Sequence, residues 1–138
     1  MRYIRTIFFI GAILSLVGCS NRVGVVSTNA SSFLTGAQVT NLTQKAQFGD
    51  RDAAFKLYLF YNEIKLDRDT SLKWLTKAAE CGDAGAQYEI GLAYDGEFYP
   101  DLIDMAKAKY WFRRAADNGN IDAKSKLAEL QMENANGK

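Results

Sequence analysis

The sequence contains no histidine and only one proline, Pro100. Without histidine, the chain cannot build Ser/His or Cys/His catalytic pairs or a His-ligated zinc site. A single proline suits a helix-rich domain with one notable loop, because proline interrupts helices. We also find no G-x-S-x-G, no P-loop, no Rossmann glycine pattern and no metal-spaced cysteines. The sequence therefore predicts no catalytic residue, no metal and no cofactor.

An excess of charge of either sign is also lacking. The chain has 17 basic and 16 acidic residues, a net charge of +1. Arg2 and Arg5 lie in an N-terminal segment that we expect to be removed, and without them the basic count is 15. Such a balance argues against a polybasic surface for nucleic acid or for an anionic membrane. At 138 residues, one domain is expected.

Cysteine is scarce, with Cys19 and Cys81 only. By count the two could form one disulfide, but Cys19 has a better explanation at the N-terminus. We interpret Cys81, beside Gly82 at a helix end, as a small half-buried residue in a turn. The alternative is a reactive or intermolecular thiol.

Residues 1–18 have the organisation of a lipoprotein signal peptide. A short basic region precedes the apolar run 6–17, which is too short to span a bilayer comfortably. The run ends in Leu-Val-Gly-Cys, which resembles the bacterial lipobox, where the leader is cut before a cysteine that becomes lipid-modified. The resemblance implies lipidation of Cys19, and Ser20 after it implies an outer-membrane location facing the periplasm. The alternative is an ordinary signal peptide that happens to carry a cysteine.

The remaining chain divides into a spacer, a domain and a tail. Residues 19–38 are rich in Ser, Thr, Asn and Gly, and we interpret them as the lipidated N-terminus and a flexible spacer. Acyl chains would anchor this end, each buried methylene contributing about 0.8 kcal/mol. A repeat domain is expected over 39–133, followed by a frayed tail over 134–138.

The stretch from Trp74 to Gly96 recurs in part along the chain. Five residues recur 37 positions later, as Trp111, Ala115, Ala116, Gly119 and Ala123. Five have identical or similar counterparts 33 positions earlier, at Gly49, Asp50, Ala53, Leu57 and Tyr61. A period in the mid-thirties made of helix pairs is typical of an α-solenoid. The predicted fold class is therefore all-α, a short α-solenoid of antiparallel helix pairs with about two and a half repeats.

Helix boundaries follow from apolar spacing and capping residues. We expect helices over 39–48, 52–63, 69–81, 104–118 and 123–133, and one that begins at Asp83 or Ala84 and ends before Gly96. Either Asp50 or Asp52 caps the second helix, and either Asn120 or Asp122 begins the last. Gly82 suits the left-handed position that ends a helix.

Two longer motifs resemble a known family. They are Ala86-Gln87-Tyr88-x-Ile90-Gly91-x-x-Tyr94-x-Gly96 and Asp104-x-x-x-Ala108-x-x-Trp111-x-x-x-Ala115-Ala116-x-x-Gly119. They resemble the first and second helices of a Sel1-like repeat, which is related to the tetratricopeptide repeat. The first unit departs from this pattern, with Tyr58 in place of Gly91, Ser71 in place of Ala108 and Glu63 in place of Gly96. We therefore expect irregular packing in the first unit.

The resemblance also implies a partner site, because the first helix of each tetratricopeptide pair lines the concave face. On that geometry the groove-facing residues are Phe55, Leu59, Asn62, Tyr88, Leu92, Asp95, Asp122, Ser125 and Glu129. The four apolar ones would form a strip of the kind that marks partner sites. The alternative is that they pack against neighbouring helices. Loop 97–100 is either a contact loop or a cover over the helix ends.

These inferences give a non-enzymatic, lipid-anchored, periplasmic protein-binding module. By family analogy, it is an immunity protein against a periplasm-acting secreted effector, such as a type VI secretion phospholipase, or an adaptor of an envelope or secretion assembly. A structural envelope lipoprotein is a third role. An enzyme acting on cell-wall fragments or β-lactams is the alternative of another class, although Ser125-Lys126 has the wrong order for a Ser-x-x-Lys motif.

Overall fold

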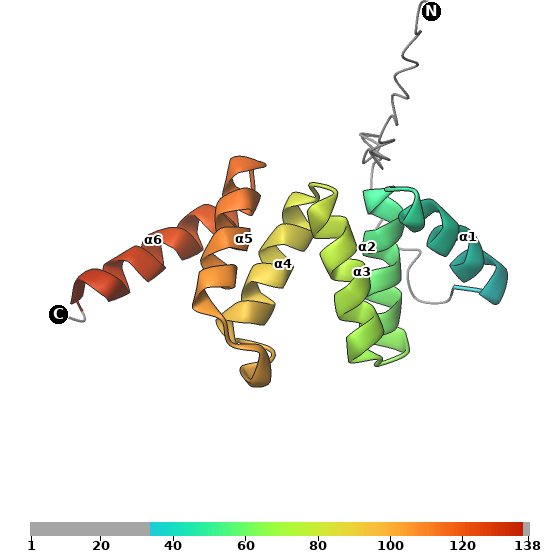
Figure 1. The fold of residues 1–138 in the computed structure, drawn as a ribbon, viewed down its shortest axis with the longest axis horizontal. Coiled ribbons are helices and arrows are strands. Elements are labelled where there is room, and N and C mark those ends of the chain that lie inside the picture. The colour runs from blue at the N-terminus through green and yellow to red at the C-terminus, as the bar shows by residue number, and fades with distance from the viewer. Residues whose placement is uncertain (1–33, 137–138) are drawn as a thin grey trace, which may run out of the picture.

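A computed structural model describes residues 34–136, and this part of the chain is all-helical. The α-helices are α1 (Gly36–Gln47), α2 (Arg51–Leu59), α3 (Arg68–Glu80), α4 (Ala84–Asp95), α5 (Met105–Asp117) and α6 (Ile121–Asn136). A π-helical turn, η1 (Phe60–Ile64), continues α2, and a 3₁₀ turn, η2 (Pro100–Leu102), lies between α4 and α5. Each helix packs against its neighbours in the sequence, so the helices form one row with α1 and α6 at its ends (Figure 1). This is the arrangement predicted for a helical-repeat protein.

An aspartate begins each of the four central helices, because the first N–H groups of a helix have no partner inside it. The capping residues are Asp50, Asp67, Asp83 and Asp104. Each carboxylate accepts a hydrogen bond from the backbone N–H three residues further on, at 2.7–3.1 Å. Asp50 rather than Asp52 is therefore the cap of α2. Asn120 rather than Asp122 does the same before α6, where its side chain accepts from Ala123 N–H at 2.8 Å.

Glycine ends α3 as predicted. Gly82 has φ of +86°, a left-handed conformation that glycine adopts without the steric cost of a side chain. Its N–H donates to Ala79 O at 3.1 Å, which satisfies one of the last carbonyls of the helix. The chain then turns directly into Asp83, so one short segment both closes α3 and begins α4.

Two clusters of buried side chains hold the row together. The first joins α1, α2, α3 and α4, and consists largely of alanines around Leu57, Trp74, Leu75 and Ile90. The second joins α4, α5 and α6 and consists of Leu92, Ala108, Phe112 and Leu130. Tyr94 packs against both clusters, so the core continues from one repeat to the next.

Three predicted boundaries differ from the structure. Helix α1 begins at Gly36, inside the predicted spacer 19–38, because Thr35 and Gln38 form a reciprocal capping box there. Helix α6 runs to Asn136, into the predicted frayed tail 134–138. The second predicted helix ends in the π-helical turn η1. The signal peptide, Cys19 and residues 19–33 of the spacer lie outside the described residues, and none of the helices within 34–136 has the length and apolar composition needed to cross a membrane.

Candidate partner-binding cleft

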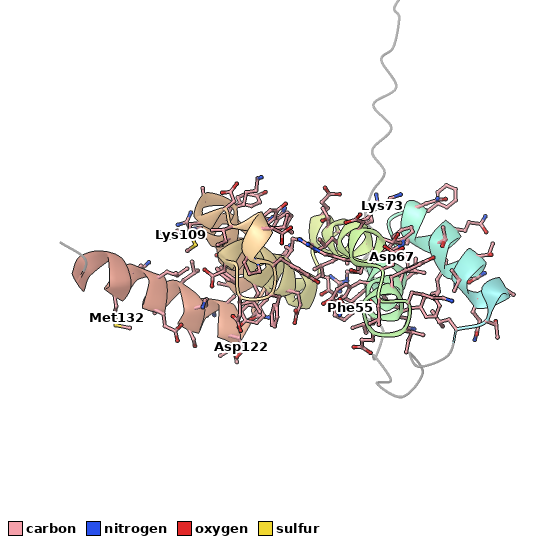
Figure 2. The ribbon with its side chains drawn as sticks, turned by 90° about the horizontal axis from the view of Figure 1, so that it is seen from below. Phe55, Asp67, Lys73, Lys109, Asp122 and Met132 are labelled. Atoms are coloured by element: carbon pink, nitrogen blue, oxygen red, sulfur yellow. The ribbon has the colours of Figure 1, made fainter. Side chains whose placement is uncertain are left out.

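The helical row has two sides, which can be followed in Figure 2, where the row is seen from below. Lys73 of α3 and Lys109 of α5 point to one side of the row, and Phe55 of α2 and Asp122 of α6 point to the other. The two helices of the second repeat also differ in charge. Helix α5 carries four basic residues and one acidic residue, whereas α4 carries two acidic residues and no basic one. A chain that is nearly neutral in sum therefore has helices of opposite charge.

A cleft of about 410 Å³ lies between the two repeats. Its lining residues come from both repeats and from the loop after α4: Tyr58, Asn62, Leu75, Glu89, Phe98 and Tyr99. Its volume falls in the range of about 300–1,000 Å³ typical of small-ligand pockets. Three aromatic rings and a few polar groups thus surround a space large enough for one long side chain.

The first repeat departs from the second at two positions beside the cleft. In the second repeat, a Cβ added to Gly91 would lie 2.6 Å from the ring of Phe112, so that ring fills the space above the glycine. In the first repeat, Tyr58 stands at the position of Gly91 and Leu75 at the position of Phe112. Both Tyr58 and Leu75 line the cleft.

The loop that borders the cleft is fixed where it leaves α4. Gly96 has φ of +88°, and a Cβ there would lie 2.5 Å from the side chain of Ile103. Only glycine permits both this backbone conformation and this close approach. The N–H of Asp104 donates to Tyr94 O at 2.8 Å, which joins the far end of the loop to α4.

A second contact ties the middle of the loop to the first repeat. Arg68 donates to both carboxylate oxygens of Asp101, at 2.8 and 2.9 Å, and its guanidinium lies 4.5 Å from the centre of the Tyr99 ring. Tyr99 packs against the first core cluster, while Phe98 is 57% exposed at the cleft. The loop therefore covers part of the first core cluster, and Phe98 is exposed on it; a role of the loop in contacting a partner stays a prediction.

The electrostatics of the cleft are set by Glu89. Burial raises the pKa of its carboxyl group, and the negative charge of Glu97 raises this pKa further. Burial also raises the pKa of the Tyr58 hydroxyl, with smaller contributions in the same direction from Glu89, Tyr99 and Glu63. Both shifts indicate a partly dehydrated space of negative potential.

Two of the three partner-site residues predicted in the first repeat, Asn62 and Phe55, lie at or beside this cleft. Asn62 lines it directly. Phe55 is half-buried, with its ring 5.5 Å from that of Tyr58, and packs against the first core cluster. Leu59 is half-buried. Their role in binding a partner stays a prediction.

In the second repeat, the expected exposure of Leu92 is wrong. Leu92 is 6% exposed and packs with Phe112 and Leu130, because α6 covers this position at the end of the row. Tyr88 is half-buried with its ring 5.7 Å from that of Phe112. The apolar strip is therefore interrupted, and the alternative of packing against neighbouring helices holds for these two residues.

The predicted polar residues at this end differ in their environments. Asp95 forms an ion pair with Lys126 at 3.0 Å, which leaves it only partly available to a partner. Glu129 is exposed on α6, and so are Asp122 and Ser125. The structure does not bring these residues into the cleft.

Sequence reasoning missed the three residues that give the cleft its shape and charge: Tyr58, Leu75 and Glu89. The sequence does indicate that Tyr58 is unusual, because it stands where the second repeat has Gly91. No feature of the sequence indicated Glu89, because it lies at a variable position of the repeat motif. Cys81, at the end of α3, is 7% exposed and more buried than expected. Among residues 34–136, no group of three or more Cys, Asp or Glu side chains is placed to hold a metal ion.

The paired helices, their aspartate caps and the glycine turns define a helical-repeat protein. Residues 52–83 and 84–120 match the Sel1 repeat, and the chain belongs to the Sel1-repeat family. This confirms the resemblance seen in the motifs. Proteins of this class bind other proteins through their repeats, so the chain is a Sel1-repeat protein-binding module.

Two relatives come from Escherichia coli (strain K12). YibG is 36% identical over 107 residues, which are 76% of this chain and 70% of YibG. The Sel1-repeat-containing protein YjcO is 37% identical over 81 residues, which are 59% of this chain and 33% of YjcO, so the chain spans a third of that protein. No solved structure matches the chain.

Proposed function

We propose that the chain holds a partner protein at the cleft between its two repeats. The cleft itself carries this proposal, because aromatic and polar groups from both repeats and from the loop converge on one space of about 410 Å³. Buried aromatic anchors with a few polar groups provide most of the binding energy at protein interfaces. Phe98 is 57% exposed at this cleft and is therefore available to a partner.

The proposed location is the periplasmic side of a bacterial outer membrane, with Cys19 as the lipid-modified residue. The lipobox-like Leu-Val-Gly-Cys after a short apolar run supports this proposal. A Cys19→Ser chain should then remain unprocessed or leave the membrane. A variant that is still processed and still fractionates with the membrane, as measured by immunoblotting and carbonate extraction, would contradict the anchor.

Within this function we favour an immunity role, in which the module neutralises a secreted effector that acts in the periplasm, such as a phospholipase. A module with two repeats and a small binding surface suits a single tight partner better than an assembly with several. The proposed activity is binding without catalysis. An adaptor role in an envelope assembly remains the second candidate, and it uses the same cleft.

A protection assay tests the immunity role. Cells that lack the chain should be killed by sibling cells that deliver the effector, and the wild-type chain should restore survival. Phe98→Ser should fail to restore it. Tyr110→Ser is the matched control, because Tyr110 is a 51% exposed aromatic residue on α5. Survival without the chain would contradict immunity, and full protection by Phe98→Ser would contradict the use of the cleft.

A further inference from the structure

We propose that the cleft receives a cationic side chain, a lysine or an arginine, of the bound partner. This inference rests on the proposed function and adds the chemistry of the contact. It commits to a partner segment that carries an exposed basic residue.

Charge complementarity is the first argument. Glu89 lines the cleft, and the effect of Glu63 on Tyr58 and of Glu97 on Glu89 shows that two further carboxylates act on the same space. Within the described residues, Glu89 forms no ion pair. No lysine or arginine lines the cleft, and two cations that act on its surroundings are engaged elsewhere. Arg68 is paired with Asp101 at 2.8 Å, and Lys126 is paired with Asp95 at 3.0 Å.

The aromatic lining is the second argument. Tyr58, Phe98 and Tyr99 border the space that Glu89 faces. The face of an aromatic ring attracts a cation within about 6 Å of its centre, and the attraction grows as water is excluded. A lysine or arginine also has a methylene stem that would contact these rings while its charged end reaches the carboxylate.

The chain contains the same contact within itself. The Arg68 guanidinium lies over the ring of Tyr99 at 4.5 Å and holds Asp101 through two hydrogen bonds. A partner cation in the cleft would repeat this combination of one ring and one carboxylate, with Phe98 or Tyr58 as the ring and Glu89 as the carboxylate. The structure therefore already accommodates one cation beside Tyr99, a residue that lines the cleft.

Other side chains fit less well. A neutral apolar group would remove water from Glu89 without supplying an opposite charge, which is unfavourable for a half-buried carboxylate. An acidic group would be repelled by Glu89 and Glu97. The cleft therefore discriminates by charge, and this discrimination can be measured with small probes.

The test uses the full chain in detergent micelles and blocked peptides of the form Gly-Gly-Xaa-Gly-Gly, observed by saturation-transfer difference NMR. Xaa is lysine, arginine, glutamate or norleucine, which has the length of lysine without its charge. We expect the lysine and arginine peptides to bind about tenfold more tightly than the norleucine peptide. The glutamate peptide should give no saturable signal.

Two variants locate the effect. Glu89→Gln keeps the shape of the side chain and should bring the lysine peptide to the level of the norleucine peptide. Glu80→Gln changes an exposed carboxylate of α3 that does not line the cleft, and should leave the preference unchanged. Should Glu89→Gln fail to fold, Phe98→Ser changes an exposed residue of the cleft and should also weaken the lysine peptide.

The inference is overturned if norleucine binds as tightly as lysine, or if folded Glu89→Gln keeps the full preference for a cation. These outcomes are separate from the protection assay. If wild type and Glu89→Gln protect cells equally, the cationic contact is wrong while the immunity role stands. If the chain gives no protection but the peptides show the charge preference, the proposed role fails while the cation site stands.

Discussion

The two repeats share a helix plan but fill the space between their helices in opposite ways. In the second repeat a glycine on the first helix, Gly91, lies under a large ring on the second helix, Phe112, which is 0% exposed. In the first repeat the large ring is on the first helix, as Tyr58, and the second helix provides Leu75. Both residues of this exchange line the cleft, and the caps and helix order are the same in the two repeats.

The largest effect should come from removing the ring that closes the second repeat. Phe112→Ala should lower the free energy of unfolding by about 3–5 kcal/mol, because the ring is fully buried and its loss leaves a cavity. Leu75→Ala at the equivalent position should cost less, about 2–3 kcal/mol, because the buried leucine is smaller than the phenylalanine ring and leaves a smaller cavity. Urea denaturation of both variants measures this difference, and equal losses would mean that the repeats pack alike.

A smaller loss of stability should follow from adding a methyl group at Gly91, beside the ring of Phe112. Gly91→Ala should cost about 1–3 kcal/mol, since its Cβ would lie 2.6 Å from Phe112. Adding Phe112→Leu, the residue type of the first repeat, should recover part of this cost, and a double-mutant cycle gives the coupling. Gly36→Ala is the control, because a Cβ there meets no atom within 4 Å. If the changes in stability of Gly91→Ala and Phe112→Leu simply add in the double variant, the two positions do not compete for the same space.

The turns within the repeats should respond to glycine in opposite directions. Leu66 has φ of +52°, a left-handed conformation that costs an L-residue about 1–2 kcal/mol. Leu66 is 80% exposed, so Leu66→Gly should raise stability by about 0.5–1 kcal/mol after the entropy cost of glycine. In the second repeat Gly96 already provides the left-handed residue, and Gly96→Ala should lower stability. Thermal unfolding distinguishes the two signs, and a loss with Leu66→Gly would show that its side chain stabilises the turn.

The smallest effect is on the pH dependence of stability, and it comes from Glu89 of the second repeat. The folded-state pKa of Glu89 is raised, so the protonated form is favoured on folding. Its contribution to stability is fully present below the unfolded pKa of about 4.3 and is lost as pH rises through the folded pKa. Glu89→Gln should therefore be more stable than wild type at neutral pH, with a smaller difference in acid. Parallel pH–stability curves from denaturant titrations would contradict this environment for Glu89.

The repeat period predicted the helix order and narrowed the capping residues of α2 and α6 to pairs, because these features depend on neighbours a few residues away. Gly82 shows this clearly, since its type and place in the repeat were enough to predict its conformation. The exposure of Leu92 was not predicted correctly, because it depends on how the incomplete last repeat lies over α4. Glu89 was missed for a related reason: the cleft that it lines is completed by loop residues Phe98 and Tyr99, and the same loop is held by Arg68, far away in the sequence.

The sequential packing of the helices has a consequence for how the chain opens. Helices α1 and α6 each have one main neighbour, whereas each helix between them packs on both sides. Local opening in such arrays starts at the ends. Amide hydrogens of α1 and α6 should therefore exchange with solvent before those of α3 and α4. The walls of the cleft belong to the middle of the row, so they keep their arrangement while the ends open and close.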